Sequence, residues 1–320
     1  MYAIEAEALT KRYAGRTVVD GVDLHVRAGH VHALLGPNGS GKTTTVRMLA
    51  TLLRPTSGSA RILGFDTVRE TERVQRHIGL VGQFHAVDPR LTGTENLTMF
   101  ARLNGLRATA ARKHVAELLE RFDLTAASDR PVRTYSGGMR RRLDIVAGMV
   151  VRPEVLFLDE PTTALDPRSR NEIYRYIEDF VHEGTTVVLT TQYLDEADRL
   201  ADAITILDTG RVIAEGTPEE IARTAGTGLD VVVVDPARTA DVAAVVGRFG
   251  GRLTGSAQTP PDPALRLSFT FDDDTEITLL PVLRALDAED IAVHDIGRRS
   301  ATLDDAFLAL TGHAEERTPA

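Results

Sequence analysis

The sequence is poor in cysteine, long apolar runs and positive charge. It contains no cysteine, which excludes a disulfide scaffold and a cysteine-ligated metal site and suits a reducing cytoplasm. Its apolar runs, such as VLFL at 155–158 and VVVV at 231–234, are far shorter than the roughly 18 residues that indicate a membrane-spanning helix. A formal net charge of -9 argues against nucleic acid as the default partner.

The first residues do not have the pattern of a secretory signal peptide. Residues 1–13 carry Glu5 and Glu7 and no apolar stretch, so we expect no secretory signal peptide. We therefore expect a cytoplasmic protein. If it works at a membrane, another polypeptide must cross that membrane.

The length suits two domains. A chain of 320 residues with 42% hydrophobic residues can bury a proper core in each. The sequence Thr217-Pro218-Glu219-Glu220 has the pattern of a capped helix start, and the main domain is expected to end near it. We assign residues 1–225 to the main domain, with a helical subdomain at about 84–150, and residues 226–320 to an accessory domain.

The main domain has the pattern of an α/β fold. Residues 22–26, VDLHV, alternate as a half-buried strand does, whereas the continuous apolar run at 155–158 suits a central parallel strand. Asp166 and Pro167 have the types expected at the cap and first position of a helix. The runs AITIL and RVIAEG, joined by Asp-Thr-Gly, predict a hairpin, so the sheet is expected to have an antiparallel flank.

The accessory domain has the element order β-α-β-β-α-β, which is typical of a ferredoxin-like unit. A terminal helix follows. The predicted elements are strands at 228–234, 251–256, 266–271 and 291–296, and helices at 238–248 and 277–288.

A phosphate-binding motif, GPNGSGKT, follows the strand VHALL and opens a helix. Its glycines allow backbone amides to wrap a β-phosphate, Lys42 reaches the β and γ oxygens, and the hydroxyl of Thr43 is placed for Mg²⁺. The motif therefore predicts ATP or another nucleoside triphosphate together with Mg²⁺. The expected nucleotide-binding residues are Gly36, Pro37, Asn38, Gly39, Ser40, Gly41, Lys42, Thr43 and Thr44.

Two carboxylates close the buried strand VLFL. Asp159 is expected at the edge of the sheet beside the phosphate loop, where it can anchor Mg²⁺. Glu160 projects one residue further and is suited to orient or deprotonate an attacking water. The pair is a strong signal because it occurs with the phosphate loop.

A second phosphate cradle is predicted at YSGGM, residues 135–139. A serine and two glycines open a helix there, which is how a chain presents free N–H groups to an anion. In order along the chain, GPNGSGKTT, Gln83, SGGM, VLFLDEP and TALD resemble the ATP-binding-cassette (ABC) transporter ATPases over about residues 3–220. The last position of the signature loop departs from the usual LSGGQ, because it is Met139.

The resemblance explains why one chain carries two cradles. In ABC ATPases, two cassettes pack head to tail, and the signature loop of each faces the ATP held by the other, so a homodimer and a separate transmembrane permease are implied. The resemblance also implies that Tyr13 stacks on adenine and that Gln83 contacts Mg²⁺ or water. It places Asp166 of TALD at the dimer interface, and Ser136, Gly137 and Gly138 on the partner's nucleotide.

One position departs from the family pattern. After TTVVLTT the family usually has a histidine at the γ-phosphate, and this chain has Gln192. An amide can donate a hydrogen bond but carries no charge near neutral pH, so Glu160 is expected to do most of the water activation. Together with YSGGM and the terminal SATLDDAFLALTGH, Gln192 makes the chain resemble daunorubicin-resistance-type exporter ATPases.

Other readings of these motifs stay open. A soluble ABC-type ATPase acting on nucleic acid or ribosomes is disfavoured by the single cassette and the negative charge. A kinase or GTPase would share the phosphate loop but not SGGM, and a low-turnover nucleotide-dependent regulatory protein is compatible with Gln192. The basic run at 140–142 and the acidic cluster Asp195, Glu196 and Asp198 are expected to be solvated helix faces.

Overall fold

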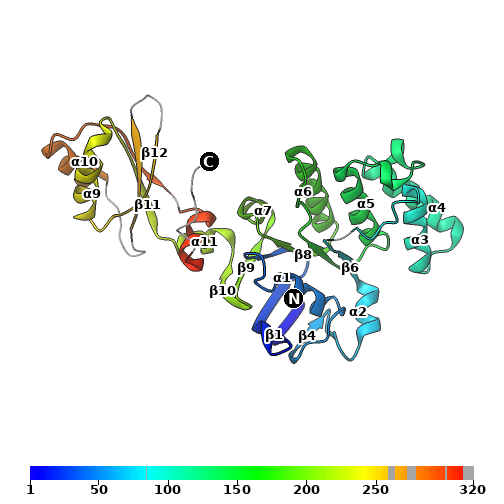
Figure 1. Ribbon diagram of the computed structural model, residues 1–320. Coiled ribbons are helices and arrows are strands. Elements are labelled where there is room, and N and C mark those ends of the chain that lie inside the picture. Colours follow the sequence, from blue (N-terminus) through cyan, green and yellow to red (C-terminus); the bar gives the residue numbers. More distant parts are fainter. Residues whose placement is uncertain (84, 259–263, 272–278, 300, 313–320) are drawn as a thin grey trace. The chain divides into compact units, whose positions relative to one another are not determined.

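The larger unit of the molecule is built on a six-stranded sheet. The structure is a computed structural model that describes residues 1–83, 85–258, 264–271, 279–299 and 301–312. It separates into two compact units, Met1–Glu215 and Gly216–Ala320, so the division falls before the predicted one (Figure 1).

The six-stranded sheet has the order β10-β9-β3-β8-β7-β6. Strands β9, β3, β8, β7 and β6 run parallel to one another. Every residue of β3, β7 and β8 is buried, as the continuous apolar run predicted for β7. The strands are β3 (Val31–Leu35), β6 (Ile78–Val81), β7 (Val155–Asp159), β8 (Thr186–Thr191), β9 (Ala203–Asp208) and β10 (Arg211–Gly216).

A second, antiparallel sheet has the order β2-β1-β4-β5. Val22, Leu24 and Val26 of β2 are buried while Asp23 and His25 are exposed, so the predicted alternation is confirmed. The main core lies between this sheet, the parallel strands and α1. The elements are β1 (Tyr2–Tyr13), β2 (Arg16–Arg27), β4 (Ser57–Ile62), β5 (Phe65–Asp66) and α1 (Lys42–Leu49).

Besides α1, the larger unit contains six α-helices among the described residues, and three of them, α3, α4 and α5, pack together. Helix α3 packs against α4 and α5, and α5 also packs on β6 (Figure 1). Asp166 caps α6 and Pro167 is its first residue, as predicted. The helices are α2 (Thr71–His77), α3 (Gly93–Leu103), α4 (Ala108–Arg121), α5 (Gly137–Met149), α6 (Pro167–His182) and α7 (Leu194–Leu200).

The smaller unit has a four-stranded antiparallel sheet in the order β12-β13-β11-β14. Helices α9 and α10 pack with the sheet around their own apolar core, and Thr217 forms a capping box at the start of α8. The first part of the predicted helix at 277–288 lies outside the described residues. The elements are α8 (Pro218–Arg223), β11 (Thr227–Val233), α9 (Thr239–Gly247), β12 (Arg252–Gln258), β13 (Leu265–Phe271), α10 (Leu279–Ala288), β14 (Val293–Arg299) and α11 (Leu303–Thr311).

Candidate functional site

The phosphate loop connects β3 to α1 in the order that the motif requires. Gly36 and Gly41 are needed because neighbouring backbone comes very close to them. A Cβ at Gly36 would lie 2.2 Å from the carbonyl oxygen of Leu207, and one at Gly41, where φ is +105°, would lie 2.9 Å from that of Val18. The Lys42 ammonium donates to the carbonyl oxygens of the loop itself, 2.7 Å from Gly36 and 3.0 Å from the oxygen of Pro37.

The loop holds polar groups that suit a phosphate. Lys42 is buried, and burial lowers the pKa of its ammonium, while the carboxylates of Glu160 and Asp159 oppose that shift. The buried hydroxyl oxygen of Ser40 has no hydrogen-bond partner. A buried cation bonded only to carbonyls, beside an unpaired hydroxyl, is a site at which an anionic phosphate can supply the missing acceptors.

Asp159 brings the end of β7 to this loop. Its Oδ1 accepts a hydrogen bond from Thr43 Oγ1 at 3.0 Å and another from Thr190 Oγ1 at 2.6 Å. The side-chain amide of Gln83, which follows β6, lies 3.5 Å from Thr43 Oγ1. A hydroxyl, a carboxylate and the Nε2 of an amide, from three different segments of the chain, therefore converge at the start of α1.

This donor set fits Mg²⁺. Across the described parts of the chain, no group of three or more His, Cys, Asp or Glu side chains could hold a metal ion on its own. Mg²⁺ does not need such a group, because it is commonly bound by one or two protein oxygens together with substrate phosphates. Thr43 and Asp159 provide oxygens of that kind, and the side-chain amide of Gln83, whose Nε2 faces Thr43, carries a further oxygen.

Glu160 is held in an unusual backbone conformation. Its φ is +49°, in the left-handed region that a non-glycine residue rarely adopts. Its N–H donates to the carbonyl oxygen of Thr190 at 3.1 Å and lies 3.0 Å from the Thr190 hydroxyl, and its Oε2 accepts from Thr163 Oγ1 at 3.3 Å. Glu160 shares a hollow with the phosphate loop, including Lys42 and Thr43.

The second cradle lies outside the phosphate-loop hollow, although its Gly137 lines a neighbouring hollow together with Gln83 and Glu160. Ser136 caps α5 by accepting a hydrogen bond from the N–H of Met139 at 3.2 Å. Gly138 faces α6 closely, because a Cβ there would be 2.4 Å from Ser169 Oγ. Among the described residues that line the phosphate-loop hollow, none belongs to this cradle.

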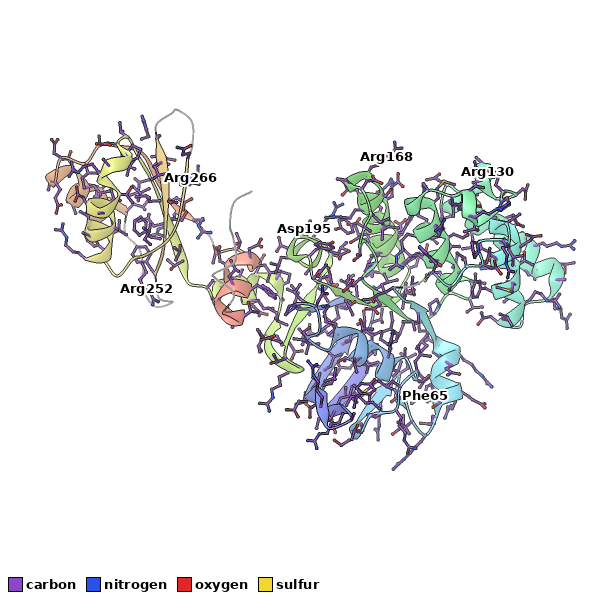
Figure 2. The ribbon with its side chains drawn as sticks, in the orientation of Figure 1. Phe65, Arg130, Arg168, Asp195, Arg252 and Arg266 are labelled. Carbon is purple, nitrogen blue, oxygen red and sulfur yellow. The ribbon has the colours of Figure 1, made fainter. Side chains whose placement is uncertain are left out.

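Three other predicted site residues also lie outside the phosphate-loop hollow as the described residues form it. Tyr13, at the end of β1, is 46% exposed, and the Lys11 ammonium lies 5.2 Å from the centre of its ring. Asp166 is exposed at the start of α6, and Arg168 projects outward from the same turn (Figure 2). Gln192 is partly buried directly after β8.

The expectation of a solvated helix face was wrong for the basic run and, in the acidic cluster, wrong for Glu196 but confirmed for Asp195 and Asp198. Arg141 in the basic run is only 5% exposed, and Glu196 in the acidic cluster is fully buried, whereas Asp195 lies at the exposed start of α7 (Figure 2). Burial raises the pKa of the Glu196 carboxyl, and hydrogen bonds from Thr191 and Thr162 oppose that shift. Helical spacing carried a signal for both, since each lies on the face of its helix that also holds apolar residues.

Within the residues that the structure describes, no helix is both long enough and apolar enough to cross a bilayer.

The chain is similar in sequence to known ATP-binding proteins. The family model described as ABC transporter matches residues 19–163. The chain is 49% identical over 320 residues to the daunorubicin resistance ATP-binding protein DrrA2 of Streptomyces coeruleorubidus, covering 100% of this chain and 98% of that protein. It is 48% identical over 317 residues to the daunorubicin/doxorubicin resistance ATP-binding protein DrrA of Streptomyces peucetius, covering 99% and 94%.

A solved structure is similar over the larger part of the chain. It is the dimeric post-hydrolysis state of the ATP-binding cassette MJ0796 bound to ADP and Pi. The TM-score is 0.62 at 26% identity, and the match covers 67% of this chain and 98% of that one.

Proposed function

The chain belongs to the ATP-binding subunits of the ABC transporter family, and from this premise we propose that it hydrolyses ATP at a site shared by two copies of the chain. It is an ABC ATPase of the drug-exporter type, and it powers export. The observation that supports the shared site is that Ser136, Gly137 and Gly138 are absent from the described lining of the hollow that contains the chain's own phosphate loop.

In the proposed homodimer, each ATP lies between the phosphate loop of one copy and the signature loop of the other. The serine and glycines at the start of α5 supply N–H donors to the γ-phosphate from the side opposite Lys42. Asp166, exposed at the start of α6, faces the partner copy. The dimeric cassette with bound ADP and Pi supports this arrangement by similarity.

The phosphate-loop residues from Gly36 to Thr44 hold the triphosphate in this proposal. Tyr13 stacks on adenine, and its exposure leaves the ring available for that role. Gln192 donates a hydrogen bond to the γ-phosphate. Thr43, Asp159 and Gln83 would hold Mg²⁺, which would neutralise charge on the phosphate oxygens when bound.

Glu160 is the proposed general base. A water molecule attacks the γ-phosphorus while its proton passes to the Glu160 carboxylate, and the bond to the β-γ bridging oxygen breaks to release ADP and phosphate. The left-handed turn at Glu160 directs its side chain into the hollow that contains Lys42 and Thr43. Lys42 balances the negative charge that develops on the phosphate oxygens.

The proposed partners are a second copy of the chain and a separate transmembrane permease. The exported substrate is a drug or antibiotic-like compound of a bacterium, as the names of the relatives suggest. The chain is then a peripheral protein on the cytoplasmic face of the membrane. Residues 226–320 form an accessory module for dimer contact or regulation.

Phosphate release tests the proposal. The parent chain should hydrolyse ATP in the presence of Mg²⁺, and Lys42→Ala and Glu160→Gln should each lose that activity. Binding of an ATP analogue separates the two variants, because Lys42→Ala should weaken it and Glu160→Gln should not. Hydrolysis at the parent rate by Glu160→Gln would refute the assigned base.

A further inference from the structure

Arg141 is a buried cation whose partners are all backbone carbonyls. It lies in the second turn of α5 and is 5% exposed. Its Nε donates to Pro161 O at 2.8 Å and its Nη1 to Gly82 O at 2.8 Å. Its Nη2 donates to Asp159 O at 3.1 Å and to Glu160 O at 3.0 Å.

These four carbonyls belong to the two segments that carry the reaction. Gly82 directly precedes Gln83, and the other three follow one another at the end of β7. A guanidinium is permanently charged, and its burial is tolerated only when its N–H groups are satisfied. The planar fork of Arg141 therefore fixes the distance between the segment before Gln83 and the turn that presents Glu160.

The turn at Glu160 needs such support. A non-glycine residue at φ of +49° costs on the order of 1–3 kcal/mol and persists only where its surroundings impose it. On one side, Thr190 receives the N–H of Glu160, and on the other side Arg141 donates to its carbonyl oxygen. The strained residue is thus held at both of its backbone polar groups.

A second residue of α5 contacts the segment that follows Gln83. Asp144, buried and one turn beyond Arg141, accepts hydrogen bonds from the N–H groups of Ala86 at 2.9 Å and Val87 at 3.3 Å. Its other carboxylate oxygen pairs with His85. Helix α5, which begins at the Ser136 cap, therefore contacts both reactive segments of its own chain.

We propose that Arg141 is a positioning residue that holds Glu160 in its reactive orientation through the backbone of residues 159–161. This inference rests on the proposed role of Glu160 as the base. Arg141 touches neither nucleotide nor water in this account. It links the helix that carries the signature loop to the catalytic turn of the same chain, so any shift of α5 is passed to Glu160.

The test uses the full-length chain and the substitution Arg141→Gln. Loss of the fork should lower kcat by roughly 10- to 100-fold, the range expected when a catalytic group is slightly misplaced. The affinity for Mg-ATP and the KM should stay within about twofold of the parent values, because none of the hydrogen bonds of Arg141 goes to a phosphate-loop residue. A kcat at the parent value in folded Arg141→Gln would overturn the proposal.

Two further variants control for folding and charge. Arg142→Gln makes the same change one residue along α5, where the guanidinium pairs with Glu172 and Phe122 O, and kcat should stay within about twofold of the parent. Arg141→Lys keeps the charge without the planar fork, so we expect an intermediate kcat. If Arg141→Gln does not fold, parent-level kcat in folded Arg141→Lys would also overturn the proposal, because an ammonium cannot span the four carbonyls.

A double variant shows whether Arg141 acts through Glu160. In single-turnover reactions, adding Arg141→Gln to Glu160→Gln should reduce the residual rate by less than about twofold, because the base is already lost. A further loss equal to that seen in the parent background would overturn the proposal. If Glu160 is not the general base, the result is different, because Glu160→Gln alone would then hydrolyse ATP as fast as the parent.

Discussion

In the proposed site, Gln192 is a neutral side chain that recognises the γ-phosphate. An amide lacks the charge-assisted hydrogen bond of an imidazolium, a difference of about 1 kcal/mol, or roughly fivefold in rate. Gln192→His should therefore retain or modestly raise turnover, with a new pH dependence between about 6 and 7.5. Gln192→Ala should lower turnover because no donor then reaches the phosphate.

Steady-state phosphate release across this pH range compares the three proteins, with the permease present if the isolated chain is silent. Equal rates for the parent and Gln192→Ala would mean that this side chain does not contact phosphate.

His32 makes the stability of the fold sensitive to acid. It is buried in β3 beside Thr205, with Nε2 2.8 Å from Thr205 Oγ1, and burial lowers the pKa of its imidazole to about 4. In the unfolded chain the imidazole takes up a proton near pH 6.5, whereas the folded chain resists protonation down to about pH 4. The free energy of unfolding should therefore fall as the pH drops through this window, by about 3 kcal/mol in all.

His32→Gln should remove this share of the pH dependence while keeping a polar partner for Thr205. The measurement is denaturant unfolding of both proteins at pH 7.5 and pH 5. The difference in unfolding free energy between them should change by about 2 kcal/mol between the two pH values. Parallel pH dependences would show that His32 is not the group responsible.

Single residues also show where sequence reasoning stops. Lys42, Thr43 and Asp159 could be predicted because each belongs to a short motif whose chemistry needs that residue at that spacing. Arg141 and Glu196 could not be read as buried from their charge, because their burial depends on carbonyls and hydroxyls supplied by distant segments. The partners of Arg141 come from the ends of β6 and β7, and Thr162 donates to Glu196.

At the scale of one element, we predict that the signature loop at the start of α5 acts on the ATP bound by the other copy of the chain. Ser136→Arg should leave the affinity for ATP near normal, because the chain's own phosphate loop is untouched, yet abolish hydrolysis at the partner's site. Ala126→Arg is a matched control, because it adds the same charge at an exposed position before α5. Hydrolysis by Ser136→Arg at the parent rate would contradict the shared site.

Mixing variants sharpens this test. When the Ser136→Arg protein is mixed with the Lys42→Ala protein, some dimers should contain one copy of each. In these dimers one shared site is intact, and the other lacks both a working phosphate loop and a working signature loop. Phosphate release from the mixture should exceed that of either variant alone if the two sites can fire singly. Homodimers of each variant, measured separately, give the baseline.

A strand could be predicted from the sequence where its hydrophobic pattern matches the faces that it buries in the fold. The half-buried alternation of β2 and the apolar run of β7 follow directly from which faces meet the core. The approach of α6 to Gly138 could not be foreseen, because it depends on how two helices cross. Helix crossings are set by side-chain packing between segments that no local pattern records.

At the scale of the whole molecule, the separate cores of the two units predict that nucleotide binding belongs to the first alone. A chain ending after Glu215 should fold, because residues 1–215 form a compact unit with their own core, and should bind Mg-ATP with parent affinity. We expect weaker dimerisation or altered coupling to the permease. Loss of nucleotide binding in a folded truncation would contradict an accessory role for the second unit.

In the proposed mechanism, ATP joins two copies of the chain and Glu160 then triggers hydrolysis. Its most direct test is the molar mass of Glu160→Gln, measured by light scattering after size exclusion with Mg-ATP and, separately, with Mg-ADP. Glu160→Gln should be a dimer with Mg-ATP and should shift toward monomer with Mg-ADP. A Glu160→Gln protein that is monomeric with ATP bound would contradict this mechanism. If the full-length chain is dimeric in every condition, the same measurement on the form ending after Glu215 shows whether ATP alone joins two copies.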